Sequence, residues 1–173
     1  MVGKGRALRC GGAVLVALIC GAQTTSPQRT TATYDDWTVR CEIREAAPPQ
    51  KSCEMVQIVN TQGQANPLSQ IAMGRLAKSE PIKAVFQVPI NVWLPAGVKF
   101  VFDEKEPALT ATFKRCVSTA CLADLDLKDD VLKKLRARSE PGRLEIKDAV
   151  QRDIAIPVSF KGFGQAFDAL SRE

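Results

Sequence analysis

The first 22 residues constrain this chain most, because they predict the compartment in which the rest of it folds. Three basic residues, Lys4, Arg6 and Arg9, precede the apolar run 13–19, and the small residues of 20–22 follow it. This order is typical of a secretory signal peptide. The run is far shorter than the ~20 apolar residues that span a bilayer. We therefore predict export and removal of residues 1–22. Lipidation at Cys20 is the less favoured alternative, because bulky Ile19 precedes it.

Four cysteines remain beyond the predicted leader: Cys41, Cys53, Cys116 and Cys121. An even number of cysteines in an exported protein indicates disulfides, and four cysteines allow three pairings. The prolines of loop 45–50 end the flanking strands, so the chain folds back there and places Cys41 opposite Cys53. A turn at 118–119 places Cys116 opposite Cys121 in the same way. A redox pair usually has two intervening residues, whereas these pairs have eleven and four, and a zinc site needs tighter spacing. Strand geometry therefore favours two structural disulfides, 41–53 and 116–121, over crossed pairings.

The sequence contains no histidine, and this removes several chemistries. The chain lacks the usual general base near neutral pH, the Ser-His-Asp and Cys-His pairings, and every zinc site that uses histidine. Its formal net charge is +5, but the leader holds three of the 24 basic residues, which leaves 21 against 19 acidic residues, or +2. So small a charge predicts no nucleic-acid partner. Nothing beyond the leader is long and apolar enough to predict a transmembrane segment.

Short alternating runs predict a β-rich fold. Residues 23–33 hold no apolar run and are predicted to be a flexible lead-in. From residue 34 onward, apolar and polar residues alternate in strand-like runs, which in chain order are 37–42, 54–60, 68–76, 82–90, 98–102, 109–116, 121–127 and 154–160. Pro157 predicts that the last of these is an edge strand. Helical patterns cover 128–138 and 164–170.

We predict one domain over 34–173, an all-β fold that forms an antiparallel β-sandwich or related barrel with one or two short helices and stabilising disulfides. One point stays open in the strand after Cys53. Val56 and Ile58 fall on the face opposite that cysteine, so either both faces are covered or a bulge intervenes.

Several polar clusters are candidate sites, and each has a simpler structural explanation. The acidic run 124–130 lacks the ligand and the glycine of a calcium loop and suits a strand followed by a helix start. The carboxylates of 103–106 would suit a hydrolase, but they lie in a charged turn. The basic residues of 133–138 suit a solvated helix face, and Trp37 and Trp93 suit a core. We assign no residue a catalytic, cofactor-binding or metal-binding role.

Six segments together resemble the invasion-associated locus B family of exported bacterial proteins. In chain order they are Asp36-Trp37-Thr38-Val39-Arg40-Cys41, Cys53-Glu54-Met55, Trp93-Leu94-Pro95-Ala96-Gly97-Val98, Phe113-Lys114-Arg115-Cys116, Cys121-Leu122-Ala123 and Ile156-Pro157-Val158-Ser159-Phe160-Lys161-Gly162-Phe163. The chain departs from the family pattern at Ala120, where the family commonly has glycine, and at Phe160, where it usually has leucine. The resemblance implies export and a β-rich disulfide fold more strongly than it implies invasion.

These observations predict a non-enzymatic binding or accessory protein of the bacterial envelope. Its predicted place is the periplasm, the outer membrane or the exterior, and its predicted partner is a protein of the envelope or of a host surface. The resemblance to the family further implies that the protein contributes to interaction with host cells. The alternatives are a periplasmic assembly subunit, which an open strand edge would favour, and a carboxylate-based hydrolase, which raised pKa values in a pocket would favour.

Overall fold

The computed structural model describes residues 28–44, 48–63 and 66–173. The predicted signal peptide lies outside these ranges, as do residues 23–27 of the predicted flexible lead-in. For residues 29–33 that prediction is wrong, because they belong to strand β1 (Arg29–Tyr34), which pairs in register with β2 (Trp37–Arg44). Threonine and tyrosine favour strands even without an apolar run, and the partner β2 supplies the pairing.

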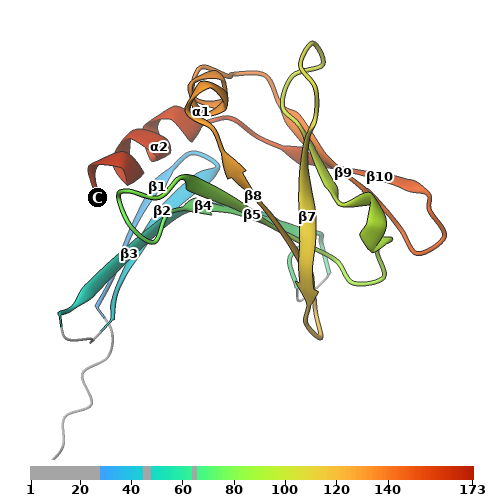
Figure 1. Ribbon diagram of the computed structural model, residues 1–173, viewed down its shortest axis with the longest axis horizontal. Helices are drawn as coiled ribbons and strands as arrows, with labels where there is room; N and C mark the ends of the chain where they lie inside the picture. Colours follow the sequence, from blue (N-terminus) through green and yellow to red (C-terminus); the bar gives the residue numbers. More distant parts are fainter. Residues whose placement is uncertain (1–27, 45–47, 64–65) are drawn as a thin grey trace, which may run out of the picture.

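Among the described residues, ten antiparallel strands form one curled sheet, which confirms the predicted fold class (Figure 1). Their order is β1-β2-β3-β4-β5-β8-β7-β6-β9-β10, so β10 lies at an edge, as Pro157 predicts. The strands after β2 are β3 (Gln50–Val59), β4 (Ser69–Gly74), β5 (Ile82–Val88), β6 (Val98–Val101), β7 (Leu109–Cys116), β8 (Cys121–Leu127), β9 (Gly142–Lys147) and β10 (Asp153–Val158). The sheet bends so that β1–β5 lie to one side of β7 and β9 and β10 to the other (Figure 1).

The four cysteines face each other in pairs on two hairpins: Cys41–Cys53 between β2 and β3, and Cys116–Cys121 between β7 and β8. Their Cα atoms are 4.1 and 3.9 Å apart, and the structure joins each pair in a disulfide. In the second hairpin the Val117 N–H donates to the Ala120 carbonyl at 2.7 Å. That bond closes the turn around residues 118–119, and the next pair outward is the two cysteines.

Two α-helices and one 3-10 turn complete the described chain: η1 (Leu94–Ala96), α1 (Asp129–Arg136) and α2 (Phe163–Arg172). Leu132 and Leu135 form the buried side of α1, and its first turn carries two aspartates that favour a helix N-terminus. α2 packs over β1, β2 and β3 and also contacts α1. No helix among the described residues is long and apolar enough to cross a membrane.

Aromatic side chains from distant elements fill the core between the two sides of the bent sheet. Trp37 of β2 meets Phe163 of α2 edge-on, with ring centroids 5.0 Å apart. Phe86 of β5 meets Phe100 of β6 at 5.6 Å. All four side chains are fully buried. The core prediction is therefore right for Trp37, but it is wrong for Trp93, which precedes η1 and stays 40% exposed.

Candidate binding surface

The acidic run at the end of β8 is neutralised by lysines of the same sheet. Lys83 of β5 lies 2.7 Å from the Asp126 carboxylate and 3.3 Å from that of Asp124, and Lys114 of β7 lies 3.4 Å from Asp124. The hydrogen bond that Lys83 donates to Asp126 is the largest cause of a raised Lys83 pKa, since it favours the charged ammonium. These carboxylates act in cross-strand ion pairs, which agrees with the simpler explanation of this run.

The second acidic cluster, in the turn after β6, is also paired with cations. Asp103 accepts from Arg138 at 2.6 Å, and Glu104 accepts from Arg143 of β9. The Lys105 N–H, first, and then the charge of Arg138 hold the pKa of Asp103 below its usual value. A hydrogen bond from the Arg143 guanidinium, and then its charge, lower the pKa of Glu104. A general acid needs a raised pKa, so this cluster gives the hydrolase alternative no support.

The same pairing reaches the basic residues of α1. Lys134 bonds Glu106 at 2.6 Å, and Arg136 bonds Asp168 of α2 at 2.8 Å. Much of the positive charge of α1 is therefore neutralised by neighbouring carboxylates. A helix face neutralised in this way is a poor basis for attraction to anionic lipid.

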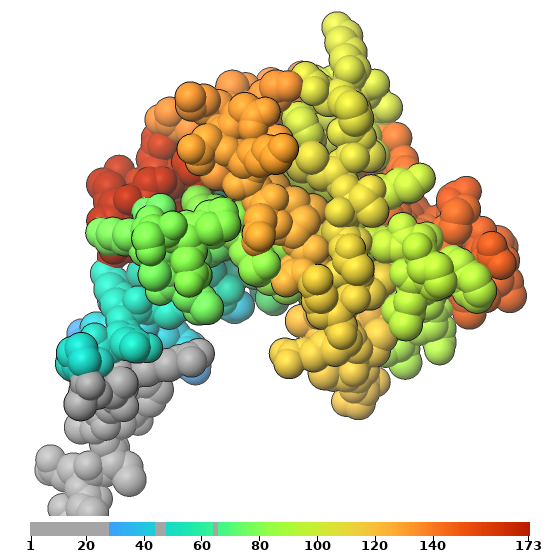
Figure 2. Space-filling model, in the orientation of Figure 1, coloured from blue at the N-terminus to red at the C-terminus, as the bar shows by residue number. Residues whose placement is uncertain are grey.

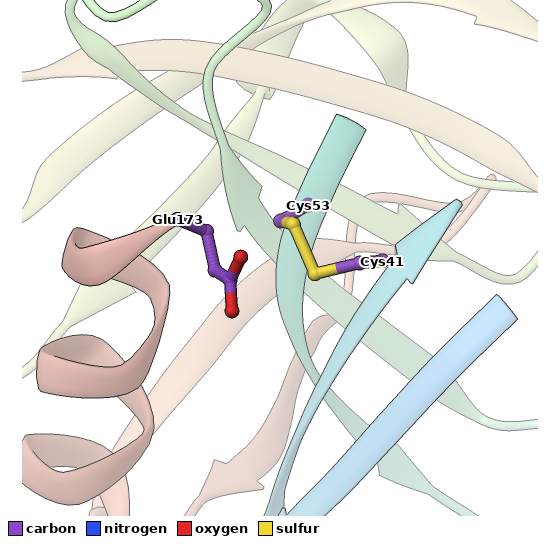
Figure 3. A group of neighbouring side chains, drawn as sticks. All are labelled: Cys41, Cys53 and Glu173. Carbon is purple, nitrogen blue, oxygen red and sulfur yellow. A yellow bond between two sulfur atoms is a disulfide. The ribbon is translucent and has the colours of Figure 1, made fainter. Parts of the chain in front are cut away.

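Glu173, at the end of α2, points toward the disulfide between Cys41 and Cys53 (Figure 3). One carboxylate oxygen and the two sulfurs lie within 4.8 Å of one another, and Lys51 of β3 pairs with the same carboxylate. Zinc binds cysteine as thiolate. Here both sulfurs are bonded to each other and offer no thiolate. The group is therefore a disulfide beside an ion pair between Glu173 and Lys51.

A groove on the outer face of the sheet, lined mostly by apolar surface, is the candidate binding site. Glu54 of β3, Gly74 of β4, Lys83 of β5 and Asp126 of β8 are successive register partners across four strands. Gly74 has no side chain, so the row has a gap between Glu54 and Lys83. A Cβ atom at Gly74 would lie 2.8 Å from the Cys53 carbonyl oxygen, so the close approach of β3 requires glycine here.

Small apolar residues deepen the same gap. Ala72 of β4 and Val85 of β5, which are paired in the next outward-facing row, lie beneath the groove. Leu76 and Pro81, from the segment between β4 and β5, border it, and the volume is about 450 Å³. In Figure 2 this segment, in green, stands beside the cyan surface of β3. The size falls within the range of small-ligand and peptide-side-chain pockets.

The groove combines an apolar floor with paired charges of both signs at its sides. Glu54 is held by Arg40 at 2.7 Å, as Lys83 is by Asp126. Leu76 is 86% exposed at the mouth, where an apolar partner would cover it. Such a surface suits a ligand that has both an apolar group and polar atoms. Protein–protein interfaces combine apolar and polar contacts in this way.

Sequence reasoning missed this groove because none of its residues forms a motif. A glycine and an alanine at alternate positions of one strand, Ala72 and Gly74, are the available signal. Their effect depends on which strands flank β4, and that pairing is a property of the whole sheet.

Comparison with known proteins agrees with this fold. The model of the family described as invasion associated locus B (IalB) protein matches residues 37–171. The chain belongs to the IalB family. Among solved structures, the crystal structure of invasion associated protein B from Bartonella henselae is similar, with a TM-score of 0.70 and 22% sequence identity over 82% of this chain and 94% of that one. At that identity the likeness shows the fold alone. No curated protein matches the sequence.

Proposed function

We propose that this IalB-family protein is an exported, non-enzymatic binding or accessory protein of the bacterial envelope. The groove on β3, β4 and β5 carries the proposal, because it offers an apolar floor between ion-paired walls. The predicted signal peptide and two disulfides support a place outside the cytosol. The similar Bartonella protein is an invasion associated protein, and this supports a protein partner at a host surface.

The charge pattern supports binding over catalysis. Where the carboxyl groups of the described residues shift clearly, at Asp103, Glu104 and Asp148, the pKa falls. A lowered pKa keeps a carboxylate ionised and paired, whereas acid catalysis near neutral pH needs the opposite shift. Within the groove, Glu54 is already paired with Arg40, and Lys83 with Asp126.

A photo-cross-linking amino acid at Leu76 tests the proposal in the native envelope. The matched control position is Val150, which is 69% exposed in the turn between β9 and β10 at the far side of the molecule (Figure 1). We expect one protein adduct at a stoichiometric level from position 76 and none from position 150. The adduct should disappear in Lys83→Glu, which leaves Asp126 beside a like charge. Equal labelling from both positions, or chemical conversion of a bound small molecule, contradicts the proposal.

A further inference from the structure

Strand β1 presents one hydrogen-bonding edge to solvent. The Ile43 N–H donates to the Gln28 carbonyl at 3.0 Å, so these directly opposed residues form a hydrogen-bonded pair. In an antiparallel ladder such pairs alternate with non-bonded ones. The main-chain N–H and C=O groups of Arg29, Thr31 and Thr33 therefore point away from β2, toward the free edge.

The two edges of the sheet differ in how they are protected. At the other edge, the Asp148 N–H donates to the Arg152 carbonyl at 3.0 Å, so these opposed residues form a hydrogen-bonded pair. By the same alternation, the main-chain groups of Asp153, Ala155 and Pro157 in β10 point away from β9. Pro157 has no N–H to offer, which blocks continued pairing. The β1 edge holds neither proline nor lysine, its register with β2 is unbroken, and its residues 29–33 are exposed. The β10 edge is therefore protected against pairing with another strand, whereas the β1 edge is free to pair.

We propose that a second copy of this chain pairs with β1, antiparallel and about a twofold axis at Thr31. In this register Thr31 faces the partner subunit's Thr31, and Arg29 faces the partner's Thr33. Each of the three facing pairs exchanges two main-chain bonds, so all six outward N–H groups, three from each copy, gain an acceptor. The outward set is centred on Thr31, and this symmetry lets two identical edges satisfy each other completely.

The side chains fit that register without a like-charge clash. Threonine opposite threonine is a favourable cross-strand pair. Each Arg29 keeps its own partner, Glu42, at 2.9 Å, and faces an uncharged threonine across the seam. The two arginines stand four residues apart along the strands, about 13 Å at ~3.3 Å per residue. On the inner face, a hollow of about 380 Å³ between β1 and α2 gives room for the partner's side chains.

Opposite charges at Thr31 test the register directly. We expect the full exported chain to show a concentration-dependent monomer–dimer equilibrium in sedimentation equilibrium. Thr31→Lys and Thr31→Glu each place two like charges face to face, so each should weaken dimerisation by about tenfold or more. An equimolar mixture of the two variants should form a heterodimer at least as tightly as the unaltered chain. The control pair, Ala155→Lys and Ala155→Glu, alters the middle outward residue of β10 and should leave dimerisation unchanged.

The outcomes separate this proposal from its rivals. A monomer at all concentrations overturns it, as does a dimer that the Thr31 variants leave intact. A dimer weakened by the Ala155 variants instead places the contact at β10 and also overturns it. Thermal melts of each variant, which we expect to match the unaltered chain because Thr31 is exposed, exclude loss of folding as the cause. The cross-linking result at Leu76 is independent of all of these.

Discussion

Gln57 and Ser159 exchange two hydrogen bonds across the fold. The Gln57 amide nitrogen donates to the Ser159 carbonyl at 2.8 Å, and its amide oxygen accepts from the Ser159 N–H at 3.1 Å. The Trp37 indole N–H also donates to this carbonyl at 2.9 Å. Ser159 directly follows β10, whereas Gln57 and Trp37 lie in β3 and β2. These bonds therefore tie the chain beyond one edge of the sheet to strands near the other edge, and they hold the curl.

Gln57→Leu should destabilise the protein by about 1–3 kcal/mol, because Gln57 is 4% exposed and its loss leaves the Ser159 N–H without a partner in a part-buried site. Urea unfolding followed by circular dichroism measures the change. The neighbouring variant Ile58→Thr alters a 45% exposed side chain and should stay within about 0.5 kcal/mol. Equal effects of the two variants would contradict the role given to Gln57.

Gly162→Ala should cost more than Gly63→Ala, although both glycines have nearly the same backbone, with φ of +77° and +78°. That conformation alone costs an alanine about 1–2 kcal/mol. A Cβ at Gly162 would also lie 2.0 Å from the Tyr34 carbonyl oxygen, whereas one at Gly63 meets nothing within 4 Å. Overpacking adds about 1–3 kcal/mol. The urea midpoint of Gly162→Ala should therefore be lower than that of Gly63→Ala. The reverse order would contradict a tight contact between the start of α2 and the end of β1.

Replacing both cysteines of one disulfide by alanine should destabilise the protein more for Cys41–Cys53 than for Cys116–Cys121. The sequence separations are 12 and 5, so loop-closure entropy alone gives about 3 and about 2 kcal/mol. Each pair contains one buried cysteine, Cys41 and Cys121, so the expected ranking rests on loop length. Denaturation under non-reducing conditions measures both double variants. Equal losses in the two double variants, or a larger loss without Cys116–Cys121, would contradict this ranking.

Stability should fall in acid partly through Asp148, in the β9–β10 turn. The Arg152 N–H, first, and then its guanidinium and the Val150 N–H hold the Asp148 pKa below its ordinary 3.8. A lowered folded-state pKa contributes stability above the ordinary pKa, and this is lost as pH falls through the folded value. The melting temperature of Asp148→Asn should therefore lie below that of the unaltered chain at pH 7, and the gap should close below about pH 4. A gap that stays constant with pH would contradict this assignment.

Alternation was sufficient to find strands whose one face is buried, such as β5 and β8. It left β3 undecided, and the structure shows an unbroken register there: Val56 pairs with both Thr38 and Ala72 and is buried, whereas Ile58 is exposed. Both faces are covered at Val56, so no bulge is needed. β1 was missed because nearly all of it is exposed, and only pairing with β2 identifies it as a strand.

The candidate site was harder to predict than the fold. Cysteine positions depend on local hairpins, so their facing pairs follow from turn residues nearby in the chain. The groove depends on Gly74 lying between Glu54 and Lys83, and these three residues come from different strands. Trp93 looked like a core residue because apolar neighbours surround it in sequence, but the η1 turn leaves its ring at the surface. Features made by long-range pairing are invisible to spacing rules.

Mass spectrometry of the protein taken from intact bacteria, with free thiols blocked at lysis, tests the central claim most directly. That claim is an exported chain stapled by two permanent disulfides between facing cysteines. We predict a chain that begins after residue 22 and carries no blocked cysteine, with peptides linked only as 41 to 53 and 116 to 121. Blocked thiols at these positions, crossed links, or a retained leader would contradict it.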